Sequence, residues 1–291
     1  IWSVTGSPAG KPKNKMIMRL FKTKPVELLN VVTDRHIDAL LSYYPLPIPV
    51  ASVECWPYFE DLYKDIFDLK TIRRRLEISL RRMVENNDDF KSYGVALSSR
   101  IIDAMRATDA FKRYVTTVEK KPKVSAPIEP MTKINIYTGT GGDYISVDII
   151  KANYSSLKFV DPELVFNTNT WEELVRRFTD DEFFIMSKYF RQIVLGNLEN
   201  KRNQATQTML QEYLYKQLVN YGASTEKLDI AGKSGTDEIF IKTTNWERDV
   251  KIVESVVNSL PENMRSLWRI TPFKLAKLGR SKAYVRTPLV L

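Results

Sequence analysis

The sequence has one cysteine and one histidine among its 291 residues. The lone Cys55 excludes a disulfide within the chain and fits a reducing intracellular compartment or a virion. The lone His36 leaves little room for histidine chemistry, because a zinc site or a catalytic triad would have to use that one residue. Catalysis by this chain would therefore depend mainly on carboxylates, lysines, arginines and bound metal.

Long hydrophobic runs are also missing. No apolar stretch approaches the roughly 18 to 20 residues that a membrane-spanning helix needs, so we expect no membrane partner. The chain begins Ile1-Trp2-Ser3-Val4, with neither an initiating Met nor a signal pattern, and we expect a fragment or a processed chain. Its apolar content of 43% is nevertheless enough to bury a sizeable core, and its length indicates two domains.

The net charge of +9 points to a polyanionic partner, RNA or DNA. Three basic clusters carry much of it: Lys11, Lys13, Lys15, Arg19, Lys22 and Lys24; Arg73, Arg74, Arg75, Arg81 and Arg82; and Arg265, Arg269, Lys274, Lys277, Arg280, Lys282 and Arg286. A single cluster is more often a solvated face, but three on one chain favour contacts to phosphates. The candidate nucleic-acid-binding residues are Arg73, Arg74, Arg75, Lys274, Lys277, Arg280 and Lys282.

The pattern predicts a mostly helical basic domain over residues 1–118. Ile72, Leu76, Leu80 and Met83 recur at helical spacing and place most of the arginine cluster away from the buried stripe. No constellation of residues here suggests chemistry, so we expect a scaffold or a module that docks protein partners. A run of lysines and prolines over 119–130, unsuited to helix or central strand, predicts a linker.

Residues 131–291 predict an α+β domain that ends in basic strands. Strand patterns occur at 134–137, 144–149, 228–230, 239–241, 268–275 and 283–290. Between them lie two short helices opened by Thr170 and Asp180, a long helix over 201–221, and a helix from a Thr244 capping box to Leu260. From Tyr144 the order is strand, helices, strand, strand, helix, strand. This order predicts a split βαβ (ferredoxin-like) antiparallel sheet with helices on one face.

That topology brings acids together. In a split βαβ sheet the first strand lies beside the third, so Asp148 would approach Asp237 and Glu238 in the hairpin. Converging carboxylates repel one another unless a divalent cation lies between them, and Mg²⁺ prefers such oxygen ligands. A pair of such ions supports phosphoryl transfer. The simpler alternative is that Asp148 caps a turn or forms a salt bridge.

Two segments resemble a known family. Val-Asp-Ile-Ile-Lys-Ala-Asn-Tyr at 147–154 is similar to the first palm motif of reverse transcriptases and related right-hand polymerases. Gly-Thr-Asp-Glu-Ile-Phe-Ile at 235–241 is similar to the palm hairpin that carries a pair of acids. The sequence departs from that family in having Asp-Glu in place of two aspartates and in lacking a Pro-Gln-Gly turn before the long helix.

The resemblance implies a palm domain that acts as a template-dependent nucleotidyltransferase on nucleotides and nucleic acid. It implies metal ligands at Asp148 and Asp237, assistance from Glu238, a nucleotide sugar against Asn153 or Tyr154, and triphosphate-binding cations at Lys188 and Arg191. The alternative belongs to another class, a non-enzymatic nucleic-acid-binding or assembly protein of the kind that viruses use. In that case the split βαβ sheet is a catalytically inactive platform.

Overall fold

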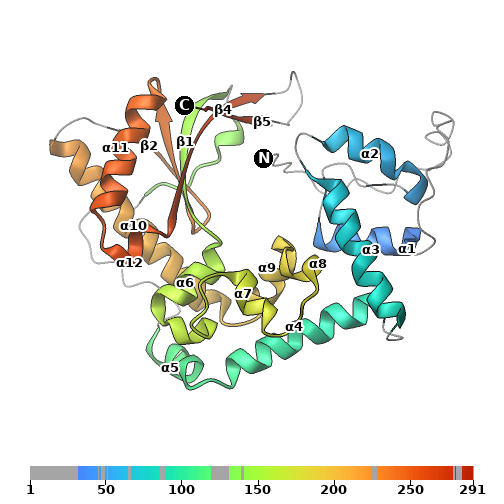
Figure 1. Cartoon of the computed structure of the whole chain (residues 1–291). Helices are drawn as coiled ribbons and strands as arrows, with labels where there is room; N and C mark the ends of the chain where they lie inside the picture. The colour runs from blue at the N-terminus through green and yellow to red at the C-terminus, as the bar shows by residue number, and fades with distance from the viewer. Residues whose placement is uncertain are drawn as a thin grey trace. The chain divides into compact units, whose positions relative to one another are not determined.

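The computed structural model describes residues 32–44, 46, 50, 52–64, 67–85, 89–118, 131–138, 141–224, 228–277, 279 and 284–290. The predicted basic arm at Lys11–Lys24 and the predicted linker at 119–130 lie outside these residues. The chain forms two compact units. One contains 6–104 and 169–194 and is called the helical unit; the other contains 105–168 and 195–291 and is called the sheet unit. Figure 1 shows the elements of each.

The described residues of the helical unit form α-helices in the N-terminal part of the chain and in a later segment. They are α1 (Asp34–Tyr43), α2 (Trp56–Tyr63), α3 (Leu69–Glu85), α4 (Phe90–Arg106), α7 (Trp171–Arg176), α8 (Glu182–Ile185) and α9 (Lys188–Gly196), with a 3₁₀ turn, η2, at Val53–Cys55. Among the described residues, no helix of either unit has the length and apolarity needed to cross a bilayer.

Aromatic side chains hold the later segment against the early helices. The ring centroid of Tyr43 lies 5.3 Å from that of Phe184, and Phe90 lies 5.2 Å from Phe183. The hydroxyl of Ser79 donates to buried Asp181 at 2.5 Å, and Asp181 also caps α8 by accepting from Phe183 N. The grouping therefore differs from the division at 118 and 131 expected from the sequence, because residues 169–194 pack with the early helices.

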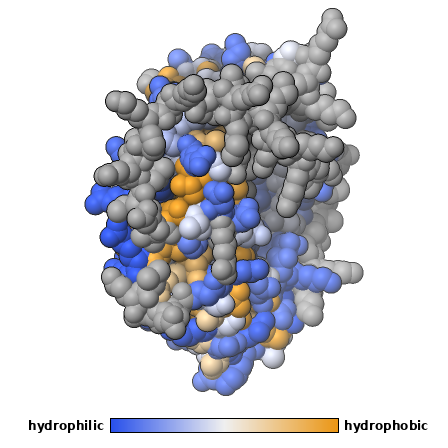
Figure 2. All heavy atoms as spheres, turned by 90° about the vertical axis from the view of Figure 1, so that its right-hand side faces the viewer, coloured by the Kyte–Doolittle hydropathy of each residue, from blue (hydrophilic) through white to orange (hydrophobic). Residues whose placement is uncertain are grey.

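One part of the helical unit exposes apolar surface. Tyr58 and Leu62 on α2 are 47% and 42% exposed, and Ile78 on α3 is 45% exposed. Figure 2, which views the side on which Figure 1 draws α1 to α3, shows hydrophobic side chains gathered between hydrophilic ones.

In the part of the sheet unit that the structure describes there are five strands and five α-helices. The strands are β1 (Gly141–Ile149), β2 (Asp229–Ser234), β3 (Glu238–Thr243), β4 (Trp268–Lys277) and β5 (Tyr284–Pro288). The helices are α5 (Asp109–Thr117), α6 (Ala152–Val160), α10 (Asn200–Ser224), α11 (Trp246–Ser259) and α12 (Glu262–Arg265), with 3₁₀ turns η3 (Ile136–Thr138) and η4 (Pro162–Val165).

The strands form one sheet in the order β2-β3-β1-β4-β5, and every neighbouring pair is antiparallel. The predicted strand at 144–149 therefore lies between β3 and β4. The expected strand at 134–137 is wrong. Residues 136–138 form η3, and Lys133 makes only an isolated bridge to Lys233 beside β2. The class is α+β, as expected.

The two faces of the sheet differ. Leu210, Leu214 and Leu218 of α10 and Val253 of α11 pack against Ile145, Val147, Ile149, Ile239 and Ile241 of the strands in one buried cluster. Figure 1 shows α10 and α11 beside the sheet. The other face carries a smaller cluster that includes Phe240, Phe273 and Tyr284. This second face, called the open face below, is where the acids lie.

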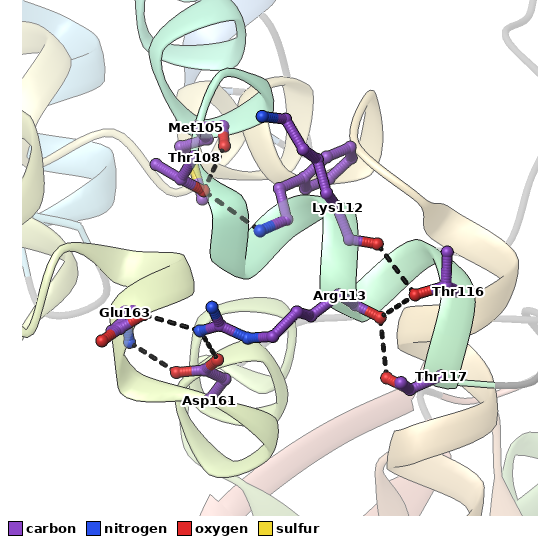
Figure 3. Close-up of polar contacts among 9 residues, drawn as sticks. Met105, Thr108, Lys112, Arg113, Thr116, Thr117, Asp161 and Glu163 are labelled. Carbon is purple, nitrogen blue, oxygen red and sulfur yellow. Dashed lines mark hydrogen bonds and ion pairs between the residues drawn. The ribbon is translucent and has the colours of Figure 1, made fainter.

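An ion-pair cluster attaches α5 to the segment before η4. Arg113 Nη2 lies 2.8 Å from Asp161 Oδ2 and 2.6 Å from Glu163 Oε2, and Figure 3 shows its side chain extending between them. Thr108 caps α5 by accepting from Phe111 N. The Thr108 cap fixes where α5 begins, and the ion pairs of Arg113, which is largely exposed, join α5 to the start of η4 and add little stability.

Candidate functional site

Strand alternation brings polar side chains together on the open face. Because Ile145, Val147 and Ile149 point into the core beneath α10 and α11, Ser146 and Asp148 lie on the opposite side of β1. A hollow of about 270 Å³ opens there. Its lining residues are Ser146, Asp148, Glu238, Arg269, Thr271, Phe273, Arg286 and Pro288.

Asp148 is held by an arginine. It pairs in register with Arg269 of β4, whose Nε lies 3.1 Å from Asp148 Oδ1 and whose Nη2 lies 2.7 Å from Oδ2. Hydrogen bonding to this carboxylate raises the pKa of Arg269 above its ordinary value. Asp148 therefore makes the salt bridge that the simpler interpretation of its sequence position predicts.

Glu238 is held by a second arginine. Its Oε1 accepts from Ser146 Oγ at 2.7 Å and from Arg286 Nη1 at 3.1 Å. The Arg286 guanidinium lies 4.6 Å from the ring centroid of Phe273 and 5.2 Å from that of Phe240. Aromatic faces attract a cation at these distances, so the ring pair and Glu238 together fix this arginine.

The acid that faces Asp148 is Glu238. These two residues are register partners, and Ile149 N donates to Asp237 O at 2.9 Å just beyond them. This bond pattern marks the pair as one without direct backbone bonds, in which facing side chains lie closest. Asp237 lies in the turn before β3, and its Oδ1 is 3.3 Å from where a Cβ on Gly235 would lie. The carboxylate of Asp237 is therefore placed against its own turn.

The chain leaves this site through a strained residue. Lys151, which precedes α6, has a φ of 49°, in the left-handed region that non-glycine residues rarely adopt. Tyr154 N and Ser155 N both donate to Lys151 O, which starts the helix. The turn thus redirects the chain within two residues of the end of β1.

Three buried amide side chains on α10 were not among the candidate residues predicted from the sequence. Asn203, Gln207 and Gln211 follow one another at four-residue intervals and are 2%, 3% and 0% exposed. Gln207 contacts Asn153 of α6 and Thr236 of the turn before β3, while Gln211 Nε2 donates to Glu238 O at 3.0 Å. The signal was present in the sequence, since three amides at this spacing share one helix face.

Asn153 and Tyr154 occupy different surroundings. Tyr154 is 3% exposed, and its hydroxyl bonds to Thr168 O at 2.8 Å inside the unit. Asn153 is half-buried, and its Oδ1 accepts from Gln207 Nε2 at 2.9 Å. The structure thus places Asn153 in the amide network and the Tyr154 side chain in the interior.

Lys188 and Arg191 lie on α9, in the residues assigned to the helical unit. Lys188 is exposed, whereas burial lowers the pKa of Arg191 below its ordinary value, partly offset by Glu172. The structure does not bring either residue into the hollow on the open face.

The candidate nucleic-acid-binding residues differ in how free their charges are. Arg73 is paired with Glu60 and Glu77, Arg74 is exposed, and Arg75 contacts Tyr44. Lys274 and Lys277 are exposed on β4, whereas Arg280 and Lys282 lie outside the described residues. Among the described members of the set, Arg74, Lys274 and Lys277 are therefore the exposed ones.

The two carboxylates that line the hollow, those of Asp148 and Glu238, are each paired with an arginine. In the part of the chain that the structure describes, no three His, Cys, Asp or Glu side chains gather as a metal cluster. Mg²⁺ in phosphoryl-transfer sites commonly takes one or two carboxylates together with water and substrate phosphates. Asp148 with an acid of the 237–238 segment would supply such carboxylates, but in the structure Arg269 occupies both oxygens of Asp148 and Arg286 pairs with Glu238.

Comparisons with protein families, curated proteins and solved structures gave no match to this chain. The chemistry of the open face is therefore argued from its own residues. It combines two carboxylates, two arginines and the hydroxyls of Ser146 and Thr271 around one hollow.

Proposed function

We propose that the sheet unit is a palm-like nucleotidyltransferase domain that binds nucleic acid and nucleotides on its open face. The observation that carries the proposal is the facing pair of Asp148 and Glu238, with Asp237 one residue before Glu238. The strand order supports the palm-like interpretation, because a split βαβ sheet sets its first strand between its third and fourth.

The arginines give this site a way to exchange partners. Asp148 and Asp237 would hold Mg²⁺, with Glu238 assisting, once the Asp237 carboxylate moved away from the turn against which it lies, and the metal would supply charge stabilisation for phosphoryl transfer. If Asp148 bound a cation, Arg269 would lose this partner and would be available to a phosphate. Arg269 suits that task, because its side chain is 56% exposed and its guanidinium can bind phosphate with two parallel bonds.

The test is primer extension and Mg²⁺ binding by the parent and by Asp148→Asn, Asp237→Asn and Glu238→Gln. The first two variants should abolish nucleotide incorporation and weaken Mg²⁺ binding while nucleic-acid binding persists, because each removes a charge and keeps the side-chain shape. Glu238→Gln should reduce incorporation. Asp229→Asn is the matched control, since Asp229 is exposed on β2. Full activity in Asp148→Asn or Asp237→Asn would refute the catalytic proposal.

A second candidate is favoured by the same ion pairs. Because Arg269 and Arg286 already neutralise Asp148 and Glu238, the open face can serve as a binding platform without metal. A platform would bind nucleic acid with no dependence on Mg²⁺ and would incorporate no nucleotide. The primer-extension experiment with the parent therefore separates the two candidates.

A further inference from the structure

Asn203, Gln207 and Gln211 of α10 occupy buried positions, where apolar side chains would cost less free energy to bury. Further along the same helix, Leu210, Leu214 and Leu218 pack against the sheet, whereas Asn203 and Gln207 are buried to a similar degree with polar side chains. Buried amides cost free energy unless their donors and acceptors are paired. Their contacts therefore show what this face of α10 holds in place.

Gln207 bridges two segments of the sheet unit. Its Nε2 donates to Asn153 Oδ1 at 2.9 Å, and its Oε1 accepts from Thr236 Oγ1 at 2.7 Å. This arrangement needs a donor and an acceptor on one side chain, which only an amide of this length supplies here. Gln207 thus links the first turn of α6 to the turn that precedes β3.

The neighbouring amides extend the link on both sides. Asn203 Nδ2 donates to Asn153 O at 3.2 Å, and Asn203 Oδ1 accepts from the hydroxyl of Ser156. Gln211 Nε2 donates to the backbone oxygen of Glu238 at 3.0 Å. Two turns of α10 therefore hold Thr236 and Glu238, the residues on either side of Asp237, while the same helix holds the start of α6.

We infer that Gln207, supported by Asn203 and Gln211, is a positioning residue that fixes the acid-bearing turn at 236–238 against the start of α6, which follows β1. Hydrogen bonds are directional, whereas apolar contacts permit sliding, so the network fixes the position of Thr236 and Glu238 relative to the first turn of α6, while the β1–β3 register sets Glu238 opposite Asp148. The consequence of this network for catalysis rests on the proposed function, whereas its effect on the position of the 236–238 turn does not.

Hydrogen exchange measured by mass spectrometry on the full chain tests the link. Gln207→Met keeps the length and helix propensity of the side chain but removes both bonds. We expect amide exchange at 234–238 to rise at least about fivefold, with exchange in β4 unchanged. Gln204→Met is the matched control, because Gln204 is exposed on the same helix. Equal exchange at 234–238 in the two variants, or an equal rise in β4, would overturn the inference.

Primer extension tests the catalytic consequence separately. In an active parent, Gln207→Met should lower kcat at least about tenfold and leave the KM for nucleotide within about twofold, because misplaced acids impair chemistry more than binding. An unchanged kcat beside faster exchange would overturn the catalytic role. A parent without activity would refute the proposed function, while the exchange experiment would still decide whether Gln207 holds the turn.

Discussion

Replacing Arg269 with Met tests whether Mg²⁺ and Arg269 compete for the carboxylate of Asp148. The substitution removes the guanidinium that makes two bonds to Asp148, at 3.1 and 2.7 Å, and keeps much of the apolar stem. If Mg²⁺ competes with Arg269 for this carboxylate, the variant should bind Mg²⁺ more tightly than the parent. The same change should slightly lower the free energy of unfolding.

The size of the effect follows from the exposure of the pair. Arg269 is 56% exposed and Asp148 20%, so solvent screens the interaction, and surface pairs typically contribute about 0.2–1 kcal/mol. The two-bond geometry favours the upper end, about 1 kcal/mol. Since about 1.4 kcal/mol is a tenfold change in affinity, the Kd for Mg²⁺ should fall about fivefold.

Isothermal titration with MgCl₂ at fixed low ionic strength measures this change. Lys274→Met removes the same charge from an exposed position on the same strand and controls for the general electrostatic effect. Mg²⁺ binding by Arg269→Met that is no tighter than binding by Lys274→Met would refute competition at Asp148. It would leave Arg269 as a structural partner on a binding platform.

Three further predictions concern stability and binding. Leu214→Ala should lower the free energy of unfolding in urea by about 2–5 kcal/mol, because Leu214 is fully buried. Met209→Ala should change it by less than about 0.5 kcal/mol, because Met209 is 44% exposed on the same helix. Equal changes in the two variants would contradict the packing of α10. Burial raises the pKa of Asp181 above its ordinary value, so the unfolded state releases this proton first and the contribution of Asp181 to stability falls as pH rises through the folded-state pKa. Asp181→Asn should therefore flatten the dependence of urea unfolding on pH between mildly acidic and neutral conditions, and an unaltered pH dependence would count against it. Replacing both Lys274 and Lys277 with Met should make the slope of log binding constant against log salt shallower by about 1.4–1.8 for nucleic acid, and an unchanged slope would show that neither lysine contacts phosphate.

The sequence by itself determined the elements whose periodicity is strong. The strand at 144–149 and the long helix near 201–221 were predicted within a few residues of β1 and α10, because alternation and helical spacing are local properties. The cap at Thr170 was also local, since its side chain accepts from Glu173 N three residues later. The strand expected at 134–137 was wrong because the segment pairs with β2 only at the Lys133–Lys233 bridge and residues 136–138 then form the 3₁₀ turn η3.

Only the tertiary structure decided the partners of the acids. The sequence placed Asp148 near the hairpin, but the register that sets Glu238 opposite it, and Arg269 on its other side, depends on backbone pairing between distant strands. Likewise, the four-residue spacing of Asn203, Gln207 and Gln211 places them on one helix face, but it does not show that this face is buried. The role of Gln207 arises because α6 and the turn before β3 converge on one face of α10, where a buried amide must find partners.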